Sequence, residues 1–219
     1  MTRLVLSTKI AVTLDGVVDM INLVEVATAK STQALLTSDV ALAYQVIASD
    51  AAINQLYRAL DEQAFETLAL QSPVAADLRA VLSAIRMIGD VERAGDLALN
   101  IAKIVRHSAP LQLPEQARAC VTEMDRRACE LLRTAAFAVA NRDPDVAERV
   151  DLMDDQIDQL RGDLYRGLLT GAWDADRNAT VNLPLIARYY ERIADHAVSV
   201  AERVEFLTTG VAHSAHTGI

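Results

Sequence analysis

The sequence is poor in the residues that build sheets, loops and disulfide frameworks. Aromatic residues make up 4% of the 219 positions, and the chain has two cysteines, five prolines and eight glycines. Leu, Val, Ile and Ala supply most of a hydrophobic content of 52%. Such a composition is typical of long helices, and a chain of this length can bury a substantial core.

The sequence also has fewer basic than acidic residues, 21 against 30. The formal net charge is −9 and the pI is about 4.9, so the chain lacks the excess of basic residues that binding to nucleic acid or to an anionic membrane requires. No apolar run approaches the ~18 residues of a membrane-spanning helix. Lys9 and Asp15 interrupt the one stretch that resembles a signal peptide. We therefore expect no nucleic-acid partner and no direct membrane insertion.

The two cysteines, Cys120 and Cys129, fall in one predicted helical segment. At the helical rise per residue they would lie roughly 13 Å apart and on opposite faces, too far for a disulfide. We expect both to act as small hydrophobic residues in a reducing compartment, which favours the cytoplasm.

Helical periodicity extends through six stretches, and sustained strand alternation is absent. Near the N-terminus, one apolar stripe contains Ile10, Leu14, Val17, Ile21 and Val24. Clusters of polar residues, glycine and proline interrupt the periodicity at 35–39, 70–74, 106–116, 141–145 and 170–182.

Two of these breaks resemble helix starts. Ser72 precedes Pro73, and Asp143 precedes Pro144. Each pair predicts an N-cap side chain followed by proline in the first helical position.

The chain also contains an internal repeat. The segment "VIASDAAINQLYRAL" (46–60) matches "VDLMDDQIDQLRGDL" (150–164), and "ERAGDLALNIAKIV" (92–105) matches "ERIADHAVSVAERV" (191–204). The order of the matches predicts an all-α fold of two tandem three-helix bundles, related by pseudo-twofold symmetry. We expect the bundles at 1–107 and 115–209 and a frayed tail at 210–219.

Paired acids recur in the third helix of each repeat. Glu92 and Asp96 share one helix face with a row of aliphatic residues, so we expect them on a core-facing stripe. The same pair returns as Glu191 and Asp195. Stacked carboxylates repel each other, and burial raises their pKa unless a cation is supplied.

Two kinds of cation remain open from the residues alone. Arginines that are close in sequence would make the pairs structural; these are Arg79, Arg86, Arg93, Arg188 and Arg192. Alternatively, a metal ion binds between helices, and oxygen ligands favour hard or borderline cations. Asp50, Asp154 and Asp158 from the middle helices, and Asn100, are further candidate ligands. His196 is turned away from Glu191 and is expected to be a surface or interhelical residue.

Catalytic motifs are missing from the sequence. It has no glycine-rich phosphate loop, no nucleophile elbow and no Cys-x-x-Cys. The Glu-x-x-His motif of di-iron bundles is also absent, which argues against oxidase chemistry. We therefore expect a binding or regulatory protein rather than an enzyme. A metal-free structural dimer and a carboxylate-metal enzyme are the alternatives.

Two long segments resemble the PhoU family of phosphate-transport regulators. They are "LALQSPVAADLRAVLSAIRMIGDVERAGDLALNIAKI" (68–104) and "LIARYYERIADHAVSVAERVEFLTTG" (185–210). The resemblance implies a cytoplasmic, often dimeric protein that couples the ATPase subunit of a phosphate ABC importer to a sensor histidine kinase. It would repress the phosphate-starvation response when phosphate is plentiful.

The resemblance also implies metal binding by the acidic motifs of the third helices. The ion would be divalent or trivalent: iron, manganese, magnesium or zinc. The implied ligands are Glu92, Asp96, Glu191 and Asp195, with Asp50, Asp77, Asp154 and Asp158 as additional candidates.

Overall fold

The computed structural model describes residues 2–211, with side chains from Leu4 onward. Its described part consists of six long helices, which confirms the all-α prediction, and the breaks between them fall within the predicted stretches. The part of the predicted frayed tail beyond Val211 lies outside the described residues. The helices are α1 (Thr2–Thr37), α2 (Val40–Gln71), α3 (Ala75–Ser108), α4 (Glu115–Asn141), α5 (Val146–Leu169) and α6 (Arg177–Thr209).

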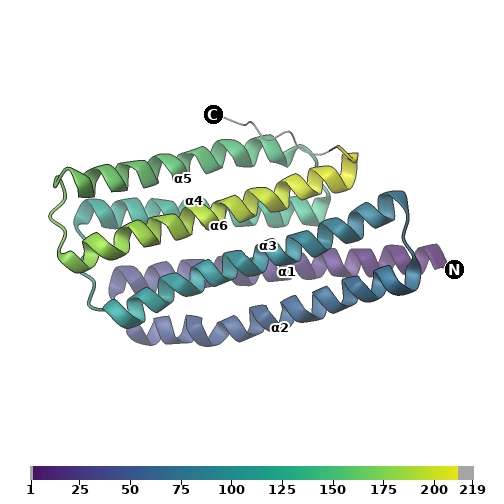
Figure 1. Cartoon of the computed structure of the whole chain (residues 1–219), viewed down its shortest axis with the longest axis horizontal. Helices are drawn as coiled ribbons and strands as arrows, with labels where there is room; N and C mark the ends of the chain where they lie inside the picture. The colour runs from purple at the N-terminus through teal and green to yellow at the C-terminus, as the bar shows by residue number, and fades with distance from the viewer. Residues whose placement is uncertain (1, 212–219) are drawn as a thin grey trace.

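The helices pack side by side into one elongated body (Figure 1). α1, α2 and α3 contact one another, as do α4, α5 and α6, so each half is a three-helix bundle. The halves meet through α1 against α4 and α3 against α6. Four helices therefore form the centre, while α2 and α5 lie at opposite edges. None of the described helices combines the length and apolarity needed to cross a membrane.

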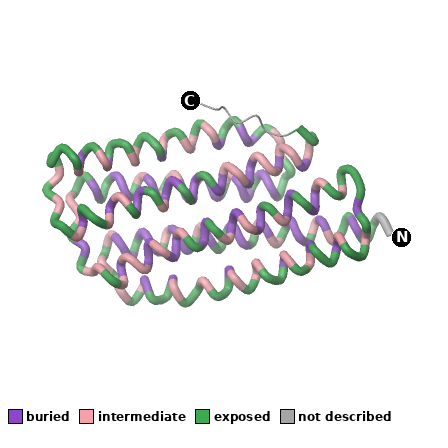
Figure 2. The backbone as a smooth tube through the Cα atoms, in the orientation of Figure 1, coloured by how far each residue is buried: buried purple, intermediate pink, exposed green. Residues whose placement is uncertain are grey.

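Each edge helix is attached through a narrow apolar stripe. In α2, Val46, Ile53 and Leu60 are buried at seven-residue spacing, and in α5 the matching positions are Val150, Ile157 and Leu164. A repeat of seven keeps one side of a helix against its neighbours. The rest of both helices faces outward, as the intermediate and exposed colours show (Figure 2).

The central helices are buried more extensively. The predicted α1 stripe from Ile10 to Val24 is fully buried, as expected. In α3, however, the buried side runs through Met87, Val91 and Ala98, and Asp96 is exposed. The expectation that Glu92 and Asp96 lie on the core-facing stripe is therefore wrong for Asp96, while Glu92 is half-buried. α3 packs against α1, α2 and α6, so apolar residues surround most of it and the helical wheel alone does not identify the core side.

Two predicted helix starts are also wrong. Ser72 is the left-handed C-cap of α2, and the residue before α3 is Val74, which supplies no side-chain cap. α5 begins after Asp145 rather than at Pro144. Side-chain caps are instead provided by Asp39 at α2, whose Oδ1 accepts from the Leu42 amide, and by Asp176 at α6, which accepts from Ala179.

Both cysteines are buried and unpaired, as predicted. Burial raises the pKa of Cys120 to about 11 and raises the pKa of Cys129 further. Because the thiolate is the reactive form, both residues act as packing side chains.

A buried polar chain crosses between the halves at the α1–α4–α6 junction. The Thr32 Oγ1 lies 2.6 Å from Oδ1 of Asp125 and 2.6 Å from the hydroxyl of Tyr190. Burial raises the pKa of Asp125, and Tyr190 is completely buried. The chain satisfies polar groups from three helices at once.

Replacing Tyr190 with phenylalanine removes one end of this chain and leaves the Thr32 hydroxyl short of a partner. We expect Tyr190→Phe to lower the free energy of unfolding by about 1 kcal/mol, measured by urea denaturation. Tyr44→Phe is the matched control, because Tyr44 is 55% exposed, and it should change the free energy by less than about 0.5 kcal/mol. Equal effects of the two substitutions would contradict a role for the buried chain.

Candidate functional site

The first acidic cluster lies between α2 and α3. Desolvation raises the pKa of Asp50 and of Glu92, and repulsion from Asp96 raises both further. Asn54 Nδ2 donates to Asp50 Oδ2 at 2.7 Å. Within residues 4–211, no lysine, arginine or histidine forms an ion pair with these three carboxylates. The cluster therefore brings negative charges together without a matching cation in contact.

The second acidic cluster lies between α5 and α6. Burial and the negative charges of Asp195 and Asp158 raise the pKa of Asp154 to about 7. Burial, followed by repulsion from Glu191, raises the pKa of Asp195. Asp50 and Asp154 occupy matching positions of the repeat, as do Glu92 and Glu191. The duplicated sequence thus produces a duplicated cluster.

Arginine neutralises only one of the paired glutamates. Glu191 is buried and accepts from Arg161 Nη1 at 2.9 Å and from Arg188 Nη1. The arginine interpretation is therefore correct for Glu191. Arg188 was among the candidates from the sequence, but Arg161 was missed, since it lies on α5 and only the tertiary fold brings it to Glu191.

The donor chemistry suits a hard cation, because the clusters consist of carboxylate oxygens under mutual repulsion. Within the described chain, no three acidic, histidine or cysteine side chains are arranged closely enough to hold a metal ion. Coordination would require the carboxylates to approach one another, and a bound cation would offset their mutual repulsion.

Two further candidate ligands on α3, Asn100 and Asp77, lie at different distances from the first cluster. Asn100 follows Asp96 by one turn of α3, and its Oδ1 accepts from Lys103 Nζ at 3.3 Å. Asp77 lies in the first turn of α3, some 22 Å along the helix from Glu92 at the usual rise. The structure therefore places Asn100 beside the first cluster and Asp77 at the far end of its helix.

A third polar group joins α3 to α6 and was not predicted. Asp90 Oδ2 accepts from Arg203 Nε at 2.8 Å, and its Oδ1 lies 3.4 Å from His196 Nδ1. Burial pushes the pKa of Asp90 upward, but the hydrogen bonds from His196 and Arg203 outweigh it, and the pKa is lowered. His196 is thus interhelical, one of its two expected placements. The sequence signal for this group was an acid, Asp90, on the apolar side of a helix. The sequence did not identify its partners, because Arg203 and His196 belong to the other half of the chain.

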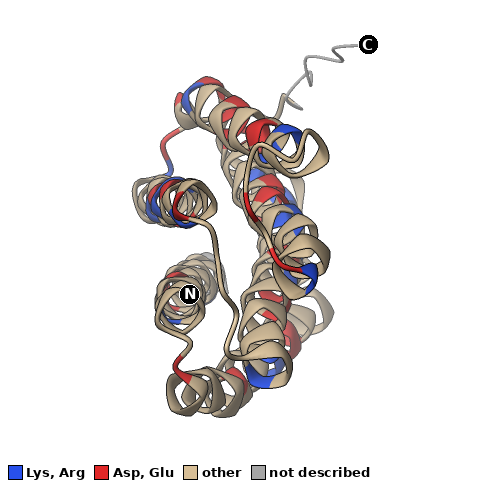
Figure 3. Ribbon diagram, turned by 90° about the vertical axis from the view of Figure 1, so that its left-hand side faces the viewer, with Lys and Arg blue, Asp and Glu red and all other residues tan. Residues whose placement is uncertain are grey.

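Charged residues of both signs are interspersed along the helices of the second half (Figure 3). Many of these charges are paired on the described surface; Arg126 forms an ion pair with Glu123, and Arg166 forms one with Asp163. The acidic clusters are therefore local features.

Comparison with known proteins identifies the family. The PhoU domain model matches residues 17–105 and again residues 121–204. The chain belongs to the PhoU family. Its two PhoU domains in tandem account for the six-helix architecture, and the family comprises accessory and regulatory proteins rather than enzymes.

Several relatives of this PhoU-family chain are similar over most of their length. It is 44% identical to the phosphate-specific transport system accessory protein PhoU homolog 2 of Mycobacterium tuberculosis, covering 88% of this chain and 91% of that protein. The crystal structure of PhoU from Pseudomonas aeruginosa superposes with a TM-score of 0.86 at 29% identity, over 94% of this chain and 99% of that one. The phosphate transport system regulatory protein PhoU from Streptococcus pneumoniae gives 0.86 at 26% identity, over 95% and 99%.

The raised pKa of Asp154 predicts a pH dependence of stability. An unfolded aspartate titrates near 3.8, and the folded one near 7, so the native state binds more protons between these values. Asp154 therefore makes the free energy of unfolding fall as the pH rises from about 4 to 7. We expect Asp154→Asn to flatten this part of the pH profile, measured by urea denaturation with a chelator present.

Glu148→Gln is the control for this prediction, because Glu148 is an exposed acid in the first turn of the same helix and is not among the charges that raise the pKa of Asp154. It should leave the slope of the profile close to that of the unchanged protein. A slope that is identical in all three proteins would show that Asp154 titrates normally.

Proposed function

We propose that this protein is an accessory regulator of phosphate uptake that acts through protein contacts and metal binding rather than catalysis. It would work in the cytoplasm as a homodimer, coupling the ATPase subunit of a phosphate importer to a sensor histidine kinase. In plentiful phosphate it would repress the starvation response. The main observation in support of this proposal is that an acidic cluster is repeated in each of the two tandem PhoU domains.

Metal binding is supported by the incomplete neutralisation of these clusters. Asp50, Glu92 and Asp96 repel one another without an ion pair among the described residues. A divalent or trivalent cation such as iron, manganese, magnesium or zinc would relieve this repulsion, and Asn100 would add a neutral oxygen. In the second domain, a cation would be bound in the same way by Asp154, Asp158 and Asp195.

The two sites would differ in strength. Glu191 already contacts two arginines, so a metal ion would have to displace those contacts or bind without this carboxylate. Glu92 has no such competitor within the described chain. The first domain would therefore hold its ion more tightly.

Elemental analysis of protein purified without a chelator tests this proposal. We expect Glu92→Gln and Asp96→Asn each to lower the metal content of the first site, while Glu191→Gln has a smaller effect. Glu66→Gln, which changes an exposed acid of α2, is the control and should retain the full content. Metal-free protein, or a content unchanged by Glu92→Gln, contradicts the ligand assignment.

Partner coupling is supported by the family and by an extended helical surface without catalytic groups. Co-purification from cells grown in high and low phosphate should recover the kinase and the importer ATPase, and phosphate should change the amounts recovered. The doubly substituted protein Asp96→Asn, Asp195→Asn reports whether the clusters control these contacts. Recovery of neither partner under either condition would exclude the coupling role.

A further inference from the structure

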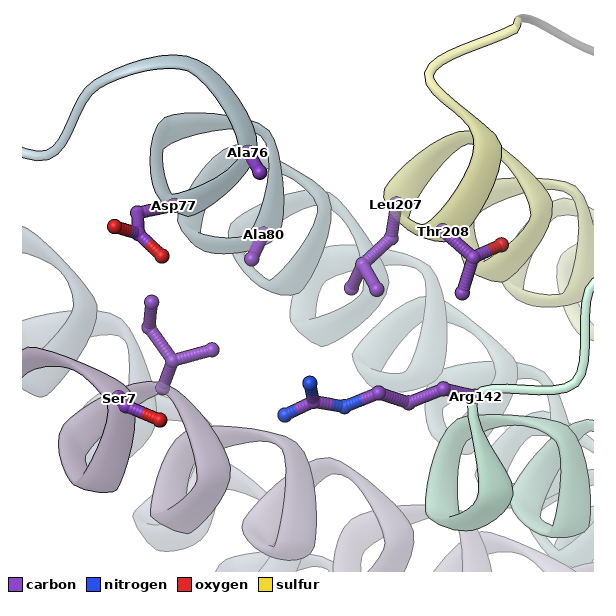
Figure 4. Close-up of a pocket in the computed structure, with 8 residues that line it drawn as sticks. Ser7, Ala76, Asp77, Ala80, Arg142, Leu207 and Thr208 are labelled. Carbon is purple, nitrogen blue, oxygen red and sulfur yellow. The ribbon is translucent and has the colours of Figure 1, made fainter.

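A cavity at one end of the molecule lies between the two halves. Its volume is about 270 Å³, and it is bounded by the start of α1, the start of α3, the end of α4 and the end of α6 (Figure 4). Its lining residues are Ser7, Ile10, Ala76, Asp77, Ala80, Arg142, Leu207 and Thr208. Because both PhoU domains contribute to it, the cavity is distinct from the acidic clusters inside each domain.

Arg142 supplies the positive charge of this cavity. It is the left-handed C-cap of α4, with φ of 51°, and its side chain extends into the space between α1, α3 and α6 (Figure 4). Within the described chain its guanidinium forms no hydrogen bond or ion pair. The matching left-handed residue of the first domain is Ser38, so the second half carries a cation where the first has a short hydroxyl side chain.

Asp77 supplies a negative charge opposite this cation. It lies on the α3 side of the cavity (Figure 4), and no ion pair joins it to Arg142 in the described structure. The Ser7 hydroxyl is also without a hydrogen-bond partner among the described residues. Thr208 already donates to the Val204 carbonyl at 2.8 Å, so it offers only lone pairs. Ile10 and Leu207 make the remaining wall apolar.

These groups restrict the ligand. A guanidinium favours an oxyanion, with which it forms paired charge-assisted hydrogen bonds, and the positive end of the α3 dipole adds to this preference. A carboxylate accepts hydrogen bonds but does not donate them. An oxyanion beside Asp77 must therefore carry a proton of its own. Between pH 6 and 7 most inorganic phosphate and a part of any phosphate monoester carry a P–OH, whereas sulfate is fully deprotonated.

We propose that this inter-domain cavity binds a protonated phosphate group, with Arg142 holding the anionic oxygens and Asp77 accepting from the P–OH. A water takes about 30 Å³, so the cavity volume of about 270 Å³ corresponds to several waters and exceeds the space that the four oxygens of one phosphate ion need. It accommodates inorganic phosphate with several waters, or a small phosphate monoester whose carbon atoms lie against Ile10 and Leu207.

Titration calorimetry at pH 6.5 with inorganic phosphate, glycerol 3-phosphate and sulfate tests the proposal on the full chain. We expect phosphate or the monoester to bind and sulfate not to bind, and the stronger of the two binders identifies the source of the phosphate group. Arg142→Gln should weaken binding by about tenfold or more. Arg58→Gln, which changes an exposed arginine of α2, should not alter it.

Asp77→Asn tests the selectivity separately. An amide donates as well as accepts, so this substitution should allow sulfate to bind and reduce the preference for phosphate. Urea denaturation of each variant verifies that it is folded. The proposal fails if neither phosphate compound binds, if sulfate binds the unchanged protein equally well, or if Arg142→Gln leaves the affinity unchanged.

Discussion

The attachment of each edge helix through a single narrow stripe determines where the acids lie. Asp50 follows Val46 by one helical turn and precedes Ile53 by almost one turn, and both hydrophobic residues are buried. The stripe therefore holds Asp50 at the boundary of the α2–α3 contact, close enough to Glu92 and Asp96 for their charges to interact. Val150 and Ile157 place Asp154 in the same way in α5. Hydrophobic packing thus supplies the free energy that keeps like charges together.

The two halves have diverged in how they compensate for that repulsion. In the second half, Arg161 and Arg188 contact Glu191, yet Asp154 remains crowded enough that its pKa approaches neutrality. In the first half, Asn54 donates to Asp50 and no charged partner contacts the acids within the described chain. Repetition preserved the positions of the carboxylates, whereas the surrounding cations changed. The proposed difference in cation affinity between the halves rests on this divergence.

Much of the architecture was predictable because it depends on local pattern. The helix breaks, the buried stripe from Ile10 to Val24 and the unpaired cysteines all follow from spacing along one helix. Asp50 was a candidate ligand from the middle helix, and the structure brings its charge close enough to those of Glu92 and Asp96 to interact; a shared metal site stays a prediction. The errors concern relations between helices. Apolar residues surround most of α3 because it packs against three helices, so the helical wheel wrongly placed Asp96 on the core side, whereas Asp96 is exposed. Ser72 caps the preceding helix instead of the following one.

The residues of the clusters and the cavity that the sequence did not reveal were missed for the same reason. Arg161 reaches Glu191 from another helix, and Arg203 reaches Asp90 from the other half of the chain. Arg142 directly precedes the Asp143–Pro144 pair, which indicates a helix start rather than a binding residue, and its relation to Asp77 exists only once four helix ends meet. A single sequence contains these residues but gives no information on the distance between them.

The buried contact of Asp90 with Arg203 has a consequence for the modularity of this fold. Each half contributes one charge to it, so a half expressed alone would present a carboxylate or a guanidinium on a newly uncovered apolar face. A one-repeat ancestor of such a chain would have needed a second copy to cover the same face. Fusion of two copies would then have made an obligate pairing intramolecular, which freed each side of the interface to evolve its own half of the ion pair.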